Sequence, residues 1–217
     1  MKTLWMIVWM LPVALAAQDR EKEIQLRLGY GLAIYGTELE YNYDDGTIHF
    51  TLQDDDSAAT SHVPIELRYE FHPRFNAGID MRFGKYLYDE DEDNSGKSNQ
   101  FSSFGIGLEG VVVSKPKFRW FIGLSLSTTK LLIKQETLIN KETFDWRGGG
   151  ARLYTGICWF VADGPIGLSF NIGRDSRTFD LKEYTNEGAT QDLKNVTGTL
   201  KVSGIDFCFG ITARLKR

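Results

Sequence analysis

Two histidines of this sequence lie near serines and aspartates, the residue types that carry out nucleophilic catalysis. His49 and His62 flank a segment that contains Ser57, Ser61 and the run Asp54–Asp56. A histidine activates a serine when the two side chains are within hydrogen-bond reach and a carboxylate orients the imidazole. Closeness along the chain does not supply that geometry, and the G-x-S-x-G turn of many serine hydrolases is absent. We therefore predict no catalytic residue and no enzyme, with a hydrolase or acyltransferase as the alternative.

The most acidic segment, Asp89–Asp93, begins like a calcium-binding loop. Its alternating aspartates are followed by Ser95 and Gly96, which match the opening of an EF-hand loop. That loop requires a bidentate glutamate at its twelfth position, where this sequence has Ser102. We therefore predict no metal ligand and no cofactor, and we expect a solvated acidic loop.

Charged residues also alternate with apolar residues, and this pattern identifies the elements that position them. In residues 23–34 every even position is apolar, while the odd positions are polar or small. Alternation with period two predicts a β-strand with one apolar face. The same pattern recurs in eight segments, with no charge on any apolar face, as expected for strands that face lipid. The segments are 23–34, 62–71, 75–84, 103–112, 118–127, 152–161, 166–173 and 205–215.

The connections between these segments alternate between short turns and long polar loops. Short proline-containing turns lie at 72–74, 114–117 and 162–165, and long loops are expected at about 37–61, 88–100, 130–148 and 174–199. Outer-membrane barrels have short periplasmic turns and long extracellular loops. Aromatic residues near the short turns predict a girdle at the periplasmic interface. They are Phe71, Phe75, Phe118, Trp120, Trp159 and Phe160.

The polar faces of the segments carry equal numbers of acids and arginines. In an eight-stranded barrel the interior is just wide enough to be filled by side chains. We expect the charges to pair there and to form a plug that closes the lumen, with a narrow pore as the alternative. The residues are Glu23, Arg27, Glu66, Arg68, Glu70, Asp80, Arg82, Glu109, Arg119, Arg152, Asp206 and Arg214.

The N-terminus predicts export. Lys2 precedes the apolar run 4–15, and Ala14 and Ala16 are small residues at the spacing of a cleavage site. We assign residues 1–17 to a signal peptide and residues 18–217 to one barrel domain. The two cysteines, Cys158 and Cys208, face inward on the sixth and eighth segments, so the seventh strand separates them and we expect two separate thiols.

With these segments and turns, the chain resembles the small eight-stranded outer-membrane β-barrels of Gram-negative bacteria, of the OmpA-barrel and OmpX kind. It also resembles the outer membrane protein β-barrel families of Bacteroidetes. The resemblance implies an all-β, antiparallel, up-and-down transmembrane barrel in the outer membrane, with both termini periplasmic. It departs from many such barrels at the end, where Leu215-Lys216-Arg217 stands in place of a terminal aromatic residue.

The resemblance implies a structural or surface-interaction role through four long extracellular loops. It also implies contact with outer-membrane lipids and lipopolysaccharide, insertion by the barrel-insertion machinery, a loop ligand of unknown identity and a monomeric state. Some relatives of this kind modify lipid A, which would be the enzymatic alternative. A soluble lipocalin-like barrel, with its apolar face turned inward, is the alternative outside the membrane.

Composition limits the remaining classes. The formal net charge is −4 and no basic patch is present, so we expect no nucleic-acid partner. A mean hydropathy of −0.27, with a single apolar run at the N-terminus, excludes a bundle of membrane helices.

Overall fold

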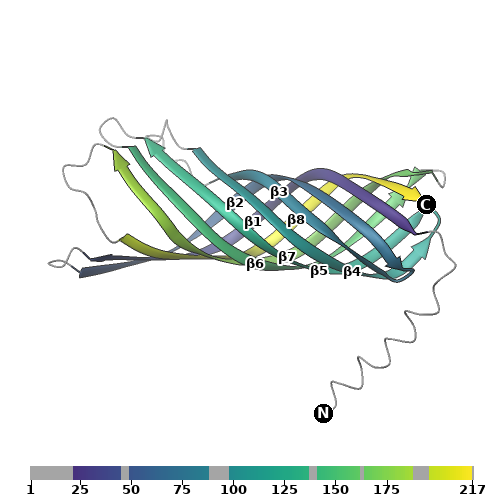
Figure 1. Cartoon of the computed structure of the whole chain (residues 1–217), viewed down its shortest axis with the longest axis horizontal. Coiled ribbons are helices and arrows are strands. Elements are labelled where there is room, and N and C mark those ends of the chain that lie inside the picture. Colours follow the sequence, from purple (N-terminus) through teal and green to yellow (C-terminus); the bar gives the residue numbers. More distant parts are fainter. Residues whose placement is uncertain are drawn as a thin grey trace, which may run out of the picture.

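The structure is a computed structural model, and it describes residues 22–44, 49–87, 98–136, 141–161, 164–187 and 196–216. Nearly all of these residues lie in eight β-strands (Figure 1). The predicted signal peptide and the acidic run 89–93 lie outside the described residues. The strands are β1 (Glu23–Asp44), β2 (His49–His72), β3 (Phe75–Leu87), β4 (Ser98–Lys115), β5 (Phe118–Glu136), β6 (Lys141–Phe160), β7 (Ile166–Glu187) and β8 (Val196–Lys216).

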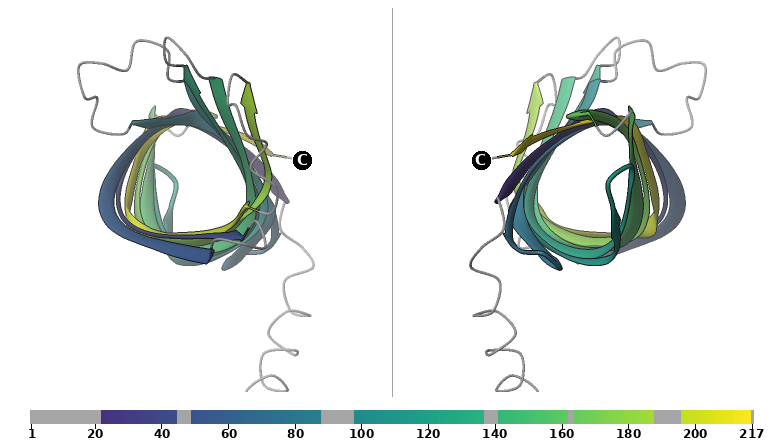
Figure 2. Two further views of the ribbon diagram at one scale, coloured as in Figure 1. Left: turned by 90° about the vertical axis from the view of Figure 1, so that its left-hand side faces the viewer. Right: turned by 90° about the vertical axis from the view of Figure 1, so that its right-hand side faces the viewer.

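The strands form a closed ring. Each strand pairs antiparallel with the next one along the chain, and β1 pairs with β8. The closing register sets Ile24 opposite Leu215 and Ile34 opposite Ile205. The end-on views in Figure 2 show the strands wound around a single axis. The prediction of an all-β, eight-stranded, antiparallel up-and-down barrel is confirmed.

An apolar belt surrounds the half of the barrel that is next to the short turns. Leu28, Leu124 and Phe209 point outward and are 53%, 48% and 59% exposed. In β1 the belt runs from Ile24 to Ile34, which is eleven residues. A tilted strand needs about 9–11 residues to cross a bilayer, so the belt has the height of a membrane. No helix among the described residues is long and apolar enough to span a bilayer.

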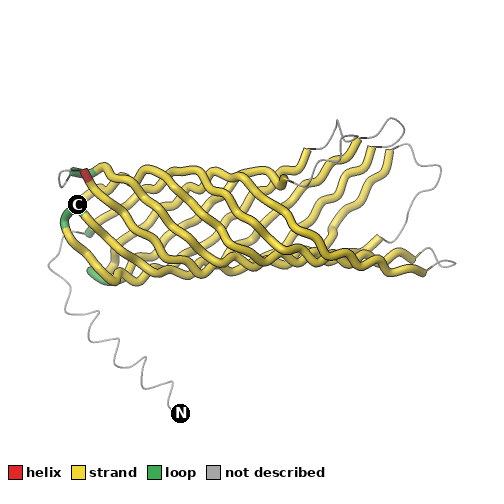
Figure 3. Tube along the Cα trace, turned by 180° about the vertical axis from the view of Figure 1, so that it is seen from behind, coloured by secondary structure: helices red, strands yellow, loops and turns green. Residues whose placement is uncertain are grey.

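The strands continue past the belt, further than the sequence predicted (Figure 3). β1 and β2 remain paired up to Asp44 and His49, and β5 and β6 up to Glu136 and Lys141. Large parts of the expected loops 37–61, 130–148 and 174–199 are therefore strand, which corrects that prediction. The prediction was wrong because it followed the apolar outer face of the strands, which stops where the belt ends. The hydrogen-bonded pairing of the strands continues beyond that level.

Beyond the belt, the barrel has an apolar interior and a polar exterior. Apolar side chains pack inside the ring at this level, and inward residues such as Trp146, Phe179 and Leu131 are almost fully buried. The polarity of the two faces is reversed relative to the belt, and the alternation is interrupted where the pairing of β6 with β7 shifts register between Asp145 and Trp146. We call this packed group the mouth cluster: Ala33, Tyr35, Ala58, Tyr86, Phe101, Leu131, Ile133, Trp146, Phe179, Leu200 and Val202.

Candidate functional site

The charged residues predicted for the lumen point into the barrel. Most are at least 93% buried, and Glu70 is the most accessible, with 12% of its side chain exposed. Two inward charged residues, Asp175 and Arg177, were missed because they fall in the segment 174–199 that was expected to be a loop. Seven carboxylates therefore face seven arginines within the described part of the lumen. They are Glu23, Glu66, Glu70, Asp80, Glu109, Asp175 and Asp206, with Arg27, Arg68, Arg82, Arg119, Arg152, Arg177 and Arg214.

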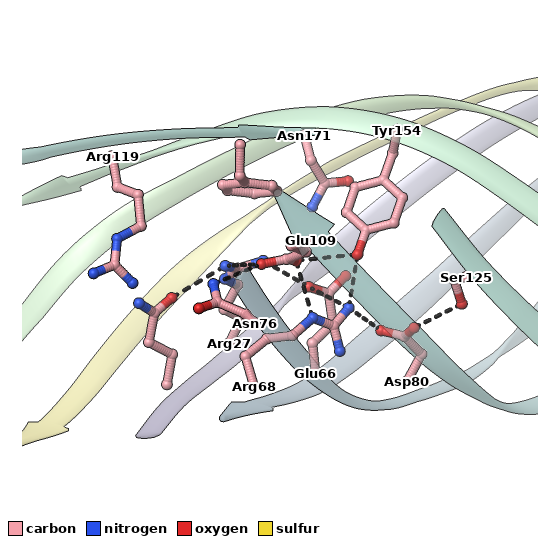
Figure 4. Close-up of polar contacts among 12 residues, drawn as sticks. Arg27, Glu66, Arg68, Asn76, Asp80, Glu109, Arg119, Ser125, Tyr154 and Asn171 are labelled. Atoms are coloured by element: carbon pink, nitrogen blue, oxygen red, sulfur yellow. Dashed lines mark hydrogen bonds and ion pairs between the residues drawn. The ribbon is translucent and has the colours of Figure 1, made fainter. Parts of the chain in front are cut away.

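Glu109 on β4 is the centre of the middle layer of this network (Figure 4). Its carboxylate accepts hydrogen bonds from Arg27 Nη1 at 2.6 Å, Arg27 Nη2 at 2.9 Å and Arg68 Nε at 2.9 Å. Asn76 Nδ2 at 3.2 Å and the Tyr154 hydroxyl at 3.0 Å complete its shell. A buried carboxylate is costly unless it is paired and hydrogen-bonded, and Glu109, with no exposed surface, meets both conditions.

Arg68 on β2 connects this layer to the adjoining strands. Its guanidinium binds Asp80, lies 3.6 Å from Glu66 and donates to the Tyr154 hydroxyl at 3.0 Å. Asp80 in turn accepts a hydrogen bond from Ser125 Oγ at 2.6 Å. The middle layer thus links strands β1 to β6 through side chains alone.

Strand register explains why these groups meet. Arg27 lies directly opposite Glu66, and Glu66 lies opposite Asp80 on the next strand, so three charges form one row. Gly123 lies between Glu109 and Tyr154 in the same kind of row. A Cβ at Gly123 would come within 2.4 Å of the Tyr154 ring, so the glycine leaves the space through which the tyrosine reaches Glu109.

Asp206 on β8 is the centre of an upper layer. Its Oδ2 lies 2.6 Å from Arg152 Nε and 2.9 Å from Arg82 Nη1. Its Oδ1 faces the Nε2 atom of His62 at 3.4 Å and the Sγ atom of Cys208 at 3.5 Å. All five of these side chains are at least 93% buried. This layer therefore combines two arginines with a histidine, a carboxylate and a thiol.

The lowest layer lies near the short turns. Arg119 pairs with Glu70 at 2.9 Å and with Glu23 at 3.4 Å. Cys158 lies opposite Arg119 on the adjacent strand, and it and Cys208 are free thiols, as the sequence predicted. The membrane-level interior thus contains three layers of paired charges, with the buried rings of Phe121 and Phe160 packed among them.

The predicted aromatic girdle is placed largely on the outside. Phe71, Trp120 and Trp159 are outward and 47%, 38% and 66% exposed, and Phe75 and Phe118 are half-buried. Phe160 differs from the prediction, because it is 1% exposed and faces the lumen. Its ring lies 4.0 Å from the Arg214 guanidinium. Phe160 directly follows the outward Trp159, so strand alternation turns it inward.

The histidine and serine residues considered for catalysis do not form a site. His62 lies within β2 and faces the lumen, whereas Ser61 beside it faces the other way. Ser57 and His49 are exposed further along the same strand, as are Asp54–Asp56. The alternation in the sequence already places His62 on the polar face of its segment, with Glu66 and Arg68, and that face is the inward one. What the sequence did not predict is that His62 meets Asp206 and Cys208 there.

Aromatic residues close the barrel above the charged layers. Tyr41 on β1 contacts Trp146 and Phe144 on β6, with ring centroids 5.6 Å and 6.2 Å apart. Phe144 also packs against Tyr184 on β7 at 4.9 Å. The contacts of Tyr41 join β1 to β6, which are not neighbours in the ring, so aromatic side chains packed against the mouth cluster extend across the barrel at this level.

A small charged group lies on the rim outside the belt. Asp145 accepts from Lys130 Nζ at 2.9 Å and Arg147 Nη2 at 3.1 Å. Burial raises the pKa of Asp145, but hydrogen bonds from these two cations outweigh that effect and hold the pKa below its usual value. Lys130 and Arg147 themselves are exposed. They border a concavity of about 480 Å³ whose other walls include Phe83 and Phe104 of the belt.

No protein-family model and no curated protein matches this chain. Among solved structures, the outer membrane protein OprG from Pseudomonas aeruginosa aligns with a TM-score of 0.62 at 8% identity, covering 91% of this chain and 98% of that one. A major outer membrane protein from Thermus thermophilus aligns at 0.44 and 10% identity, covering 84% and 99%. Ail from Yersinia pestis aligns at 0.38 and 13% identity, covering 87% and 99%. The likeness to OprG shows that the chain has the fold of an outer-membrane β-barrel, and the lower scores add nothing to it.

Proposed function

We propose that this protein is an integral outer-membrane barrel with a sealed lumen that acts through its extracellular surface. Two features together carry the proposal. The apolar belt on the outside has the height of a membrane, and the interior is occupied by paired charges. An apolar exterior around a polar interior is typical of barrels in a bilayer and is opposite to a soluble lipocalin-like barrel.

The closed lumen follows from the same network. Glu109 and Asp206 are fully buried, and each is held by two arginines from different strands. A continuous water path would need these pairs to separate, and leaving a buried charge without its partner costs about 3–5 kcal/mol. The mouth cluster adds a second, apolar obstruction above them. A pore is therefore the less favoured function.

The orientation in the membrane follows from the two ends of the barrel. The first residues of β1 and the last of β8 lie at the end with the short turns (Figure 1). Outer-membrane barrels keep their short turns in the periplasm, so we assign both chain ends to that side. The strand extensions, which have polar outer faces, would then project from the cell. These extensions and their connecting loops would bind the protein's partner.

The outer rim fits an anionic lipid. Lys130 and Arg147 stand above Phe83 and Phe104, so basic groups lie next to an apolar wall. An acyl chain would contact the wall, and a phosphate of lipopolysaccharide would pair with the cations. One closed ring completes the barrel, so we propose a monomer that reaches the membrane through the barrel-insertion machinery.

Conductance in planar bilayers tests the sealed lumen. The folded protein, identified by the mobility difference between boiled and unboiled samples on a gel, should give no steady current. Stable channels in the wild type, with a conductance altered by Arg82→Ala, would replace the sealed barrel by a narrow pore. Outer-membrane fractionation of the expressed protein is the matching test of location, and recovery in the soluble fraction would refute the membrane assignment.

A further inference from the structure

Three potential metal ligands meet in the upper layer of the lumen. The Nε2 atom of His62, the Oδ1 atom of Asp206 and the Sγ atom of Cys208 form a triangle. Its sides are 3.5 Å from sulfur to nitrogen, 3.5 Å from sulfur to oxygen and 3.4 Å from nitrogen to oxygen. We propose that this triangle is one face of a tetrahedral binding site for Zn²⁺.

The dimensions of the triangle support this assignment. Zinc binds sulfur at about 2.3 Å, and imidazole nitrogen and carboxylate oxygen at about 2.0–2.2 Å. At tetrahedral angles these bond lengths place the ligand atoms roughly 3.5 Å apart for sulfur and nitrogen, 3.6 Å for sulfur and oxygen and 3.4 Å for nitrogen and oxygen. All three observed sides agree with these values to about 0.1 Å. The fourth position would hold water or another small ligand.

Strand register brings the ligands together. Gly31 on β1 lies opposite His62 on one side and opposite Cys208 on the other. A Cβ at Gly31 would come within 2.2 Å of His62 Nε2, so only a glycine leaves room for the ring to cross β1 and reach β8. Asp206 is two residues before Cys208 and shares its inward face. The site therefore joins β2 to β8 across β1, where the barrel closes.

The same geometry argues against a nucleophilic triad. In such a triad one imidazole nitrogen faces the nucleophile and the other faces the carboxylate. Here Nε2 of His62 faces both Cys208 and Asp206, and its Nδ1 has no hydrogen-bond partner among the described residues. A proton on Nδ1 leaves the Nε2 lone pair directed at the other two ligand atoms, as a metal site requires. Three groups that converge on one point are arranged like ligands around an ion, whereas the groups of a triad stand in a row.

The surroundings orient the carboxylate. Arg82 and Arg152 bind Oδ2 of Asp206 and leave Oδ1 to face the histidine and the thiol. Carboxylates that bind metals are usually held by outer-shell partners, here the hydrogen bond from Arg82 and the ion pair with Arg152. Binding exchanges the Cys208 thiol proton, released to solvent, for Zn²⁺ on the thiolate, so the lumen gains one positive charge. The two arginines therefore lower the affinity without blocking the site, and the ion would act as a structural clamp.

Spectroscopy on the full-length folded barrel tests the proposal. The protein is refolded into detergent with one equivalent of Zn²⁺, or of Co²⁺ as a coloured substitute, because the lumen is closed once the barrel has formed. We expect one bound ion per chain, a thiolate-to-cobalt charge-transfer band and the visible bands of tetrahedral cobalt. Thermal unfolding should shift upward and saturate at one equivalent, because an ion that binds only the folded state stabilises it.

Substitutions at the two cysteines provide a matched comparison. Cys158→Ser changes the other buried lumen thiol and should keep the spectrum, whereas Cys208→Ser and His62→Gln should weaken binding by at least about 100-fold, since even outer-shell changes cost 10–100-fold. If the Cys208 variant does not fold, the charge-transfer band of the Cys158→Ser protein still identifies the thiolate as Cys208. No stoichiometric binding by the wild type, no charge-transfer band, or undiminished binding by folded Cys208→Ser would each overturn the proposal.

Discussion

Asp206→Asn should destabilise the folded barrel more than Glu109→Gln, although both replace a buried carboxylate by its amide. Removing one partner of a buried ion pair costs about 3–5 kcal/mol, because a charge remains without compensation. Among the described residues, Asp206 is the only carboxylate within 4 Å of Arg152. Of the described carboxylates, Arg82 would keep only Asp175, at 3.7 Å. We therefore expect Asp206→Asn to lower the free energy of unfolding by about 5 kcal/mol, near the upper end of this range.

After Glu109→Gln, both arginines that bound Glu109 keep other carboxylates nearby. Arg27 keeps Glu66 at 3.2 Å, and Arg68 keeps its contacts with Asp80 and Glu66. In both variants the new amide oxygen can still accept one of the lost hydrogen bonds, so the difference between them lies in the carboxylates that remain near the arginines. The expected loss is therefore near the lower end, about 3 kcal/mol.

Urea unfolding in lipid vesicles, followed by tryptophan fluorescence and by the folded band on an unboiled gel, measures both changes. The buffer contains a chelator, so that bound metal does not contribute to the free energy of unfolding. Glu38→Gln is the control, because its pair with Lys201 is 3.4 Å long and exposed, and should change stability by less than about 1 kcal/mol. Equal losses for the two lumen variants, or a larger loss for Glu109→Gln, would refute the reasoning from remaining partners.

Other substitutions test the belt, the mouth and the rim. Leu124→Arg places a charge on the lipid face and should cost about 2–4 kcal/mol in vesicle unfolding, while Leu124→Val should cost much less; similar losses would contradict a lipid-facing position. Trp146→Ala opens a cavity in the mouth cluster and should cost about 3–5 kcal/mol by the same assay, and a negligible loss would show that the cluster is not packed as described. Gly31→Val should displace His62 and lower the yield of folded band, whereas Gly36→Val, where a Cβ has space, should not; equal yields would contradict the close approach. The folded pKa of Asp145 lies below its ordinary value of 3.8, so its ion pairs stabilise the barrel fully above pH 3.8 and lose this effect as the pH falls through the folded pKa. The difference in unfolding free energy between the wild type and Asp145→Asn should therefore shrink only at acid pH. A difference that stays constant to pH 2 would show that the pairs contribute nothing.

The sequence predicted the membrane-level barrel well because one physical constraint governs every residue there. Lipid outside and paired charges inside give a strict period of two, so Leu28 and Arg27 could be placed on opposite faces before the structure was known. Above the belt the constraint changes, because water surrounds the wall and the apolar residues move inside. Asp175, Arg177 and the strand extensions were missed for this reason.

Single residues at the ends of strands were also misplaced. Phe160 looked like a girdle residue because aromatic side chains are common near short turns. Its position in the alternation of β6 turns it inward, where its ring packs against the Arg214 guanidinium. The cluster of His62 with Asp206 and Cys208 needs the register of β2 against β1 and of β1 against β8. Alternation within one strand gives the face of a residue but not its level relative to a strand far away in the sequence.

The reversal of polarity between belt and extensions has a consequence for how deeply the barrel sits in the bilayer. Exposed Lys85, Lys130 and Arg147 lie just beyond the belt on one side, and exposed Lys115 and Lys117 lie just beyond it on the other. Movement along the membrane normal by a few ångströms would draw one of these sets into the edge of the hydrocarbon, where each lysine or arginine costs up to about 1 kcal/mol, and the cost rises towards about 2–4 kcal/mol at the midplane. The depth of the molecule in the bilayer is thus set by the charged residues at the two edges of its belt, and the extensions keep a constant height above the bilayer surface, whatever they bind.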